Sequence, residues 1–254
     1  MSGPSYAEQS APSPPPGVAP ALIDDLVAGN RILADLGVVD GFGHLTVRNP
    51  ARPDHFLMSR SLAPALMTTG DVMEFDKDGN AVDQQGRAIF LERFIHAEIY
   101  KARADVMAVV HTHSAGVIPF SVTRTPMQAM FHSPAFLAAG VPVFELRDQF
   151  GQTDMLVRNN EIGAALAKTL ADKNVVLIRG HGDVVVGPNI PMAVFRAYYT
   201  DVNARLQMQA ITLGGPINYL TPEEGVKAEV VNTQIMPRAW DLWKRNLAAR
   251  RAAN

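Results

Sequence analysis

The alternation of apolar runs with amphipathic stretches in the second part of the chain most constrains its fold. "ERFIHAEIYKARA" (92–104) has an apolar helical side, and "DVMAVVHTHS" (105–114) contains the continuous apolar run typical of a buried strand. "NVVLIRG" (174–180) and "GDVVVG" (182–187) are also predicted as strands, and residues 191–213 as the longest helix. Strands that alternate with helices indicate an α/β layered fold.

The first part of the chain predicts shorter elements of the same kinds. Regularly spaced leucines predict a helix over residues 22–36, which Gly37 ends. "GHLTVRNP" (43–50) and "HFLMS" (55–59) are predicted as strands, and "VMEFDKDGNAV" (72–82) as a strand, a turn and a return strand. Because these strands follow one another closely, we expect the central sheet to be largely antiparallel.

Several smaller elements are predicted from turn and capping residues. We expect a short helix near residues 134–139, a strand at "VPVFEL" (141–146) and a helix over 158–171. Ser114 is expected to cap a helix that leads to Phe120. A final helix is expected around residues 238–251, where two tryptophans share a face.

Composition sets the domain organisation that we expect. Residues 1–20 are rich in Pro, Ser and Ala, which indicates a flexible or extended arm. The remainder, residues 21–254, contains no internal repeat and no second linker, so we expect it to form one domain.

Charge and cysteine content exclude several classes of function. The 23 Lys+Arg and 25 Asp+Glu of this 254-residue chain nearly balance, so no nucleic-acid partner is expected. The absence of cysteine excludes thiol catalysis, zinc–thiolate sites and disulfides. No apolar run approaches the ~20 residues of a membrane span, and the N-terminus lacks a signal-peptide pattern. We therefore expect a soluble, cytoplasmic protein without a membrane partner.

Two histidines stand one residue apart at the end of the apolar run in "VVHTHSAG". Residues two apart on a strand point to the same face, so His111 and His113 can reach one metal ion. Taken alone, the pair is equally consistent with a strand that ends in polar residues.

A third histidine and an acid extend this pattern. His181 lies between Gly180 and Gly182, which allow a tight turn at the end of a predicted buried strand. Three imidazoles around one divalent ion would leave an open position, as catalytic sites do. Glu92 lies at a helix entrance, four residues before His96, and this pair is either a metal half-site or an ordinary helical contact.

Glu92, "HTH" and "GHG", in that order, resemble the class II aldolase/adducin family. The resemblance extends over residues 21–215, and "GHLTVR" (43–48) aligns with the family's Gly-Asn-x-Ser-x-Arg stretch. It implies an α/β/α layered fold of the class II aldolase type and one divalent ion, Zn, Mn or Fe. The implied metal ligands are His111, His113 and His181, with Glu92 as a further ligand or a general acid–base residue.

Departures from the family pattern bear on the substrate. Sugar-phosphate aldolases of this family hold the phosphate with the Asn after that glycine, a Ser/Thr-Gly turn and a Ser-Ser pair before the acid. Here these positions are His44, Ser61-Leu62 and Phe90-Leu91. Leu and Phe would crowd and desolvate a phosphate that small hydroxyls and glycine admit. A sugar phosphate is therefore not expected.

The same region offers groups for a carboxylate substrate. We expect Arg60 and the serines on either side of it, Ser59 and Ser61, to bind a carboxylate; the alternative for Arg60 is a surface arginine on a turn. With His44 and an apolar pocket, this resembles the family branch that decarboxylates hydroxylated aromatic or pyridine dicarboxylates. His132 lies near the position of the aldolases' proton-donating tyrosine, which a neighbouring subunit contributes, so Glu92 or His132 is expected to deliver the proton. The alternative for His132 is a histidine that supports the site from behind or is buried with its hydrogen bonds satisfied.

Three other functions remain open from the sequence. Retro-aldol cleavage of a non-phosphorylated hydroxy acid would use the same metal, and a non-haem iron oxygenase would use the same fold. A non-catalytic binding module like the adducin head is disfavoured by the complete set of Glu92, His111, His113 and His181. The resemblance also implies a homo-oligomer, a tetramer with sites at subunit interfaces.

Overall fold

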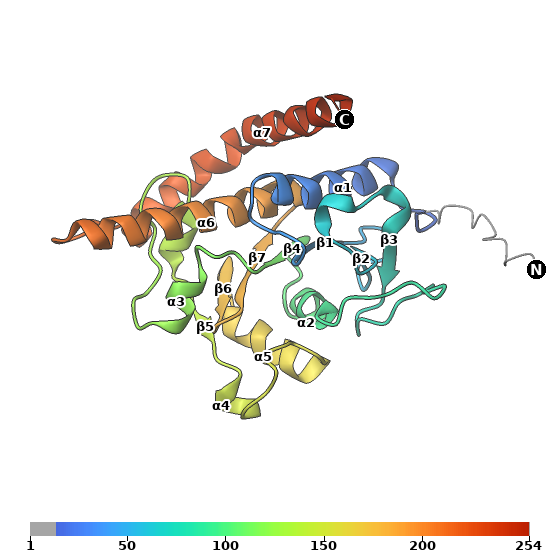
Figure 1. Ribbon diagram of the computed structural model, residues 1–254, viewed down its shortest axis with the longest axis horizontal. Coiled ribbons are helices and arrows are strands. Elements are labelled where there is room, and N and C mark those ends of the chain that lie inside the picture. The colour runs from blue at the N-terminus through green and yellow to red at the C-terminus, as the bar shows by residue number, and fades with distance from the viewer. Residues whose placement is uncertain (1–13, 254) are drawn as a thin grey trace, which may run out of the picture.

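The computed structural model describes residues 14–253, which fold around one seven-stranded sheet with helices on both faces (Figure 1). The strands are β1 (His44–Arg48), β2 (Phe56–Ser59), β3 (Val72–Phe75), β4 (Ala108–Thr112), β5 (Val143–Phe144), β6 (Val175–Ile178) and β7 (Gly182–Gly187). The α-helices are α1 (Pro20–Asp35), α2 (Arg93–Ala102), α3 (Ile118–Val122), α4 (Arg147–Phe150), α5 (Asn160–Leu170), α6 (Ile190–Leu213) and α7 (Pro222–Ala253). Three short 3₁₀ helices complete the described chain: η1 (Pro64–Leu66), η2 (Thr69–Asp71) and η3 (Ala135–Ala139).

The sheet has the strand order β3-β2-β1-β4-β7-β6-β5. All neighbouring pairs are antiparallel except β5 and β6, which are parallel. The predicted α/β fold with a largely antiparallel central sheet is therefore confirmed. Of the predicted arm, residues 1–13 lie outside the described residues, and α1 begins at Pro20.

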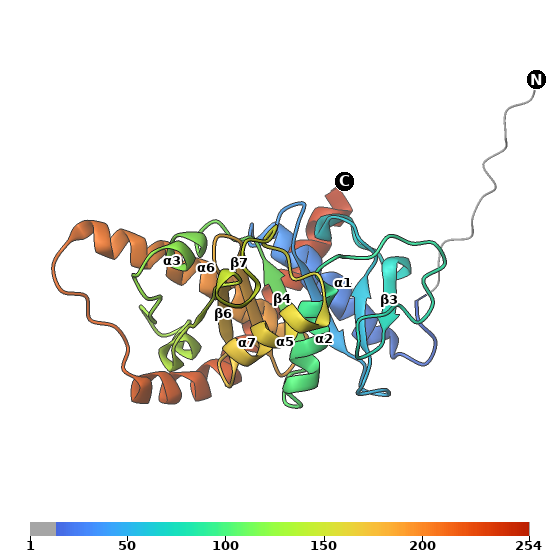
Figure 2. The same ribbon diagram turned by 90° about the horizontal axis from the view of Figure 1, so that it is seen from below.

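Two separate cores cover the two faces of the sheet. Along β4, Ala108 and Val110 pack in the core that contains the buried residues of α1, α6 and α7, whereas Val109 packs in the core shared with α2 and α5. Figures 1 and 2 show α1 and α6 on one face and α2 beside α5 on the other, with α7 outside α6. Because side chains alternate along a strand, His111 lies on the α2/α5 face with Val109.

The register between β1 and β4 places a second histidine beside His111. His44 of β1 lies directly opposite His111 of β4. Along β1, Leu45 belongs to the α1/α6 core, so His44 and Thr46 point to the other face. The sheet therefore brings His44 and His111 together beneath α2.

Three predictions about local structure were wrong or incomplete. Ser114 does not cap a helix: its hydroxyl donates to Asp201 of α6, and α3 begins later without a side-chain cap. The strand expected over 141–146 is reduced to β5. The return strand after β3 is a single bridge from Phe75 to Ala81, because the Asp76 carboxylate accepts the next backbone N–H groups and forms a tight turn.

The last helix is much longer than the predicted 238–251. α7 begins at Pro222 and continues past Pro237. Its start carries a capping box: Thr221 Oγ1 accepts from the Glu224 N–H, and Glu224 Oε2 accepts from the Thr221 N–H. None of the helices that the structure describes combines the length and the hydrophobicity that crossing a membrane requires.

Candidate metal centre

Four side chains that lie far apart in the sequence converge at one end of the central strands. Glu92 is the residue before α2, His111 lies in β4 and His113 follows it, and His181 lies in the turn between β6 and β7. Their ligand atoms all lie within 4.8 Å of one another. The Nε2 atom of His113 is 3.2 Å from that of His111 and 2.8 Å from that of His181, and Glu92 Oε2 is 3.4 Å from Nε2 of both His111 and His181. We call these four residues the tetrad.

Two glycines place His181 there. Gly180 adopts a left-handed conformation with φ of +65°, which a side chain would disfavour. Gly182 lies so close to β4 that any Cβ would overlap the Thr112 carbonyl oxygen. The chain therefore reverses tightly between β6 and β7 and presents the imidazole beside β4.

Backbone groups fix which atoms of the tetrad point inward. The Nδ1 atoms of His111 and His181 lie 2.9 Å from the carbonyl oxygens of Asp183 and Met155, so each Nδ1–H donates outward. Each neutral ring then has an unprotonated Nε2 that faces the centre. Glu92 Oε1 accepts from the Val157 N–H at 3.0 Å, which leaves Oε2 to the same centre.

This donor set fits a divalent cation. Imidazole lone pairs and a carboxylate oxygen that face one another at such short distances repel unless positive charge lies between them. Three neutral imidazoles and a carboxylate are ligands that zinc, iron and manganese accept. Backbone carbonyls that hold the outer ring nitrogens are also common around metal-bound histidines.

The electrostatics of the tetrad point the same way. Burial disfavours the charge on Glu92, but positive charge at the Nε2 side of His111 and His181 outweighs burial and holds the pKa of this carboxyl far below its usual range. Burial, together with His111 and His181, lowers the pKa of His113 to about 4. Near neutral pH the tetrad therefore offers an ionised carboxylate and a neutral His113.

Aromatic side chains border the tetrad. The ring of Phe42 stacks on that of His113 with centroids 5.9 Å apart, and Phe42 is largely exposed. Phe90 packs on His44 at 4.5 Å, and His44 in turn lies 5.2 Å from His111. The surroundings of the tetrad are therefore apolar and aromatic on two sides.

The predicted substrate-binding residues Ser59, Arg60 and Ser61 form no hydrogen bond or ion pair with the tetrad among the described residues. Ser59 is buried in β2, and the Ser61 N–H donates to Ala88 in the loop that leads to Glu92. Arg60 Nε donates to Asp71 at 2.6 Å, and its terminal nitrogens have no hydrogen-bond partner within residues 14–253. Arg60 is thus partly engaged but retains donors.

His132 does not join the tetrad within this chain. Its side chain is exposed in the loop before η3, and its carbonyl accepts from Asn232 of α7. Any role for His132 in proton transfer would therefore need a second copy of the chain.

Sequence reasoning missed several groups around the site. His96 does not form a half-site with Glu92 but lies fully buried, 2.7 Å from both His44 and Thr46. His44 and Thr46 stand two residues apart on one strand, so their side chains point to the same face, and this spacing could have indicated the cluster. The contacts of Met155 and Val157 with the tetrad come from backbone atoms, which carry no residue-type signal.

Comparisons with known proteins agree with this arrangement. Residues 24–208 match the model of the Class II Aldolase and Adducin N-terminal domain. The chain is 38% identical over 245 residues to decarboxylase tropJ of Talaromyces stipitatus, covering 87% of this chain and 92% of that protein. It is 30% identical over 205 residues to the 3,4-dihydroxyphthalate decarboxylase of Arthrobacter keyseri, covering 75% and 79%.

A solved structure shares the fold. An aldolase II superfamily protein from Pseudomonas syringae superposes with a TM-score of 0.76 at 23% identity and covers 92% of this chain and 96% of its own. The family match extends over most of the chain and includes all four tetrad residues. This protein therefore belongs to the class II aldolase and adducin family.

Proposed function

We propose that this protein is a metal-dependent lyase that decarboxylates a hydroxylated aromatic or heteroaromatic dicarboxylate. The observation that carries the proposal is the tetrad, bordered by Phe42 and Phe90. The names of two relatives, a decarboxylase and a dihydroxyphthalate decarboxylase, support the same chemistry.

In this proposal Glu92, His111, His113 and His181 hold one divalent ion, either zinc, manganese or iron. Such an ion supplies positive charge that orients the substrate's ring hydroxyl and neighbouring carboxylate and stabilises the negative charge that builds up on them. The ionised state of Glu92 and the use of both its oxygens favour a role as ligand over a role as proton donor.

The chain's other residues would bind and protonate the substrate. Arg60 retains terminal N–H donors that suit the second carboxylate. When the bond between ring carbon and carboxylate breaks, its electron pair stays on the ring, carbon dioxide leaves, and the carbon takes up one proton. We propose His132 of a second copy as the group that delivers this proton, because its side chain is exposed and an imidazole can act as a general acid.

The side chains that border the tetrad argue against a sugar phosphate as substrate. Phe90 occupies the space beside His44, and Leu91 is about half exposed next to Glu92. These side chains would strip water from a phosphate without offering N–H donors in return. A planar ring can instead lie against them with little loss.

The direct test is carbon dioxide release by the purified protein loaded in turn with zinc, manganese and iron(II). The substrates are 3,4-dihydroxyphthalate, 3-hydroxyphthalate and a hydroxypyridine dicarboxylate. We expect turnover with at least one combination of metal and substrate, and no turnover after chelation of the metal. Absence of carbon dioxide with every combination would refute the proposal. Condensation of pyruvate with an aldehyde would then identify an aldolase, and iron-dependent oxygen consumption an oxygenase.

A further inference from the structure

A buried string of four polar side chains leads away from the tetrad into the α2 face of the sheet. His44 Nδ1 lies 2.7 Å from His96 Nε2, and His96 Nδ1 lies 2.7 Å from Thr46 Oγ1. Thr46 Oγ1 lies 2.8 Å from the Tyr100 hydroxyl. All four side chains are at least nine-tenths buried. We propose that Tyr100, Thr46 and His96 are positioning residues that lock His44 as the tautomer protonated on Nε2, so that His44 donates a hydrogen bond to an anionic oxygen of the substrate.

The direction of hydrogen-bond donation along the string follows from Tyr100, the residue at its inner end. Burial raises the pKa of Tyr100, so its hydroxyl keeps its proton. Among the residues that the structure describes, two groups contact this hydroxyl: the Val109 backbone, which lowers the pKa of Tyr100 and therefore acts as an N–H donor, and Thr46 Oγ1, which is left as the acceptor. A buried hydroxyl without an acceptor is costly. Tyr100 therefore donates to Thr46.

The position of each further proton in the string, on Thr46, His96 and His44, then follows. Thr46 Oγ1 accepts from Tyr100, so its own proton is donated to its other neighbour, His96 Nδ1. His96 Nδ1 is consequently unprotonated, and this fully buried ring carries its proton on Nε2. That proton is donated to His44 Nδ1, which leaves the proton of His44 on Nε2.

The outer nitrogen of His44 is available to a ligand. Within residues 14–253 His44 Nε2 has no hydrogen-bond partner, and it is not among the fully buried polar atoms that lack one. The two nitrogens of an imidazole point in nearly opposite directions, so Nε2 faces away from His96. His44 itself lies beside His111. The unpaired N–H on Nε2 is therefore not completely buried, and it belongs to a ring that lies beside the tetrad.

This lock has a consequence for specificity, which rests on the proposed function. A histidine that is free to change tautomer can pair either with a group that donates a hydrogen bond or with one that accepts it. A histidine locked as a donor pairs only with an acceptor oxygen. We expect His44 to favour substrates with a carboxylate or an ionised ring oxygen at this position and to disfavour those with a hydroxyl donor.

Neutron diffraction from deuterium-exchanged crystals of the full chain tests the lock without any activity. We expect deuterium on Nε2 of both His44 and His96. In Tyr100→Phe, Thr46 can point either way, so we expect the deuterium of His44 to divide between Nδ1 and Nε2. Tyr198→Phe, which removes a hydroxyl outside the string, should leave His44 unchanged. Deuterium on His44 Nδ1 in the wild type would overturn the proposal, as would an unchanged His44 in Tyr100→Phe.

Calorimetric titration of the zinc-loaded protein with phthalate, which lacks the ring hydroxyl, tests the use of the donor. We expect His44→Leu to bind phthalate at least about tenfold more weakly, since a hydrogen bond to a charged group is lost. His44→Gln, which places an amide N–H near the position of Nε2, should recover most of the affinity. Tyr100→Phe should weaken binding by roughly twofold if the tautomers become equally populated. Equal affinity of the Leu variant and the wild type would overturn the role of His44.

These outcomes are separate from those of the proposed function. If phthalate binding responds as expected but no hydroxylated dicarboxylate releases carbon dioxide, the lock stands and the proposed reaction fails. If carbon dioxide is released but the deuterium lies on His44 Nδ1, the reaction stands and the lock fails.

Discussion

An imidazole can serve this site only because its second nitrogen is already engaged. His111 and His181 each turn Nδ1 to a backbone carbonyl, which leaves Nε2 as an unprotonated ligand atom. His44 uses the opposite arrangement, because its Nδ1 accepts from His96 and its Nε2 keeps the proton. Neighbouring histidines of one type thus take different chemical roles according to the partner behind each ring.

Removal of single tetrad histidines tests the metal centre. We expect His113→Ala and His181→Ala each to weaken zinc binding by more than about 100-fold, because changes behind the ligands alone cost 10–100-fold. His132→Ala, an exposed histidine outside the tetrad, should retain the metal. Competition with a chromophoric chelator measures these affinities. Wild-type affinity in either tetrad variant would rule out these residues as ligands.

Gly182 tests how tightly the His181 turn is packed against β4. A methyl group at this position overlaps the Thr112 backbone, which cannot move without disturbing His111 and His113. We expect Gly182→Ala to lower the free energy of unfolding by about 1–3 kcal/mol or more. Gly41→Ala, which has no atom within 4 Å of its added Cβ, is the matched control. Equal midpoints in urea unfolding would contradict the crowding.

At the scale of elements, Arg48 joins β1 to the end of α2. Its guanidinium donates to the carbonyls of Val106, Pro53, Tyr100 and Arg103 at 2.6–3.1 Å. The last residue of "GHLTVR" thus has a structural role that holds His44 and α2 in register. A planar group with five donors can satisfy such a fan of carbonyls, and an ammonium cannot.

We therefore expect Arg48→Lys to be poorly tolerated. At least one buried carbonyl loses its partner, which should lower the free energy of unfolding by about 2 kcal/mol or more. Arg52→Lys provides the control, because the Arg52 side chain is half exposed and its ion pair with Glu74 contributes little. Denaturant unfolding of both variants measures the difference. A similar small loss in both would show that the carbonyl contacts are dispensable.

Elements with a strong periodic pattern could be predicted from the sequence. α1, α6 and the buried strands β4, β6 and β7 lie where their apolar patterns place them. The pairing of β1 with β4 could not be predicted, because register depends on partners that a single sequence does not reveal. The first half of α7 was missed although "TPEE" carries a capping box, since its interior is mainly polar and contains Pro237.

The site divides in the same way. The tetrad followed from residue types and spacing, because strand parity and a glycine turn are local properties of the chain. The contact of His96 with His44 joins α2 to β1 across 52 residues, so it depends on the tertiary fold. The lone aromatic Phe42 beside His113 likewise carries no sequence signal.

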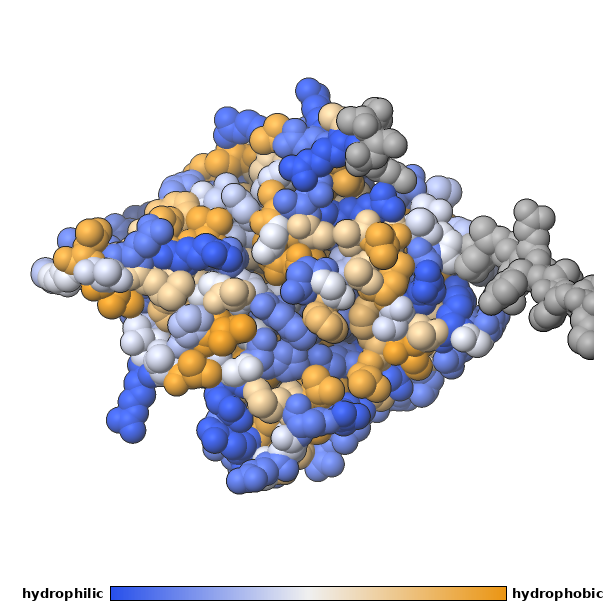
Figure 3. Space-filling model, viewed as in Figure 1, coloured by the Kyte–Doolittle hydropathy of each residue, from blue (hydrophilic) through white to orange (hydrophobic). Residues whose placement is uncertain are grey.

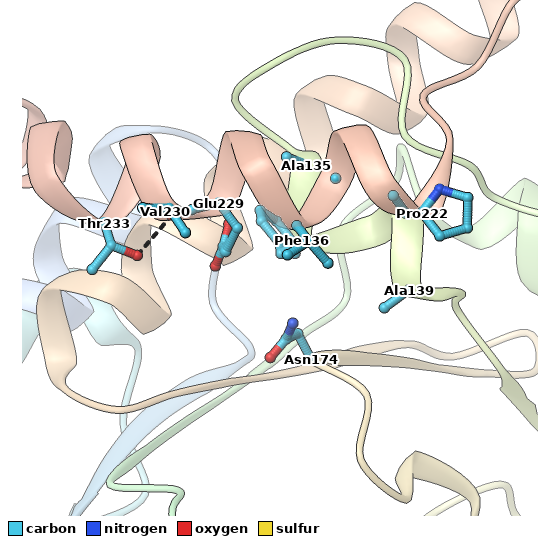
Figure 4. Close-up of a pocket in the computed structure, with 11 residues that line it drawn as sticks. Ala135, Phe136, Ala139, Asn174, Pro222, Glu229, Val230 and Thr233 are labelled. Carbon is cyan, nitrogen blue, oxygen red and sulfur yellow. Dashed lines mark hydrogen bonds between the residues drawn. The ribbon is translucent and has the colours of Figure 1, made fainter.

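At the scale of the whole molecule, apolar side chains gather on the outer helices. Figure 3 shows hydrophobic residues at the projecting end of α6, where Leu213 is 87% exposed. A groove of about 420 Å³ lies between η3 and the first half of α7 (Figure 4). Val226 and Val230 of α7 line this groove, and both are more than half exposed.

The position of this groove favours a second copy of the chain as its occupant. η3 begins three residues after His132, and Asn232 of α7 holds the His132 carbonyl. A copy seated on this face would therefore meet His132, the group that we propose to act in a neighbouring site. Apolar patches of this kind are typical of interfaces.

We accordingly expect the wild-type protein to sediment as a homo-oligomer, a tetramer under the family resemblance, and substitution in the groove to dissociate it. Val226→Asp and Val230→Asp each place a charge where the second copy would bury apolar surface, so sedimentation velocity should show a smaller mass. Gln234→Asp adds the same charge at an exposed position of α7 outside the groove lining and should leave the mass unchanged. A monomeric wild type would exclude the second copy, and an unchanged mass in both valine variants would place the interface elsewhere. If the two valine variants also lose turnover while they retain zinc, the tetrad alone is insufficient and the neighbouring copy supplies a reacting group.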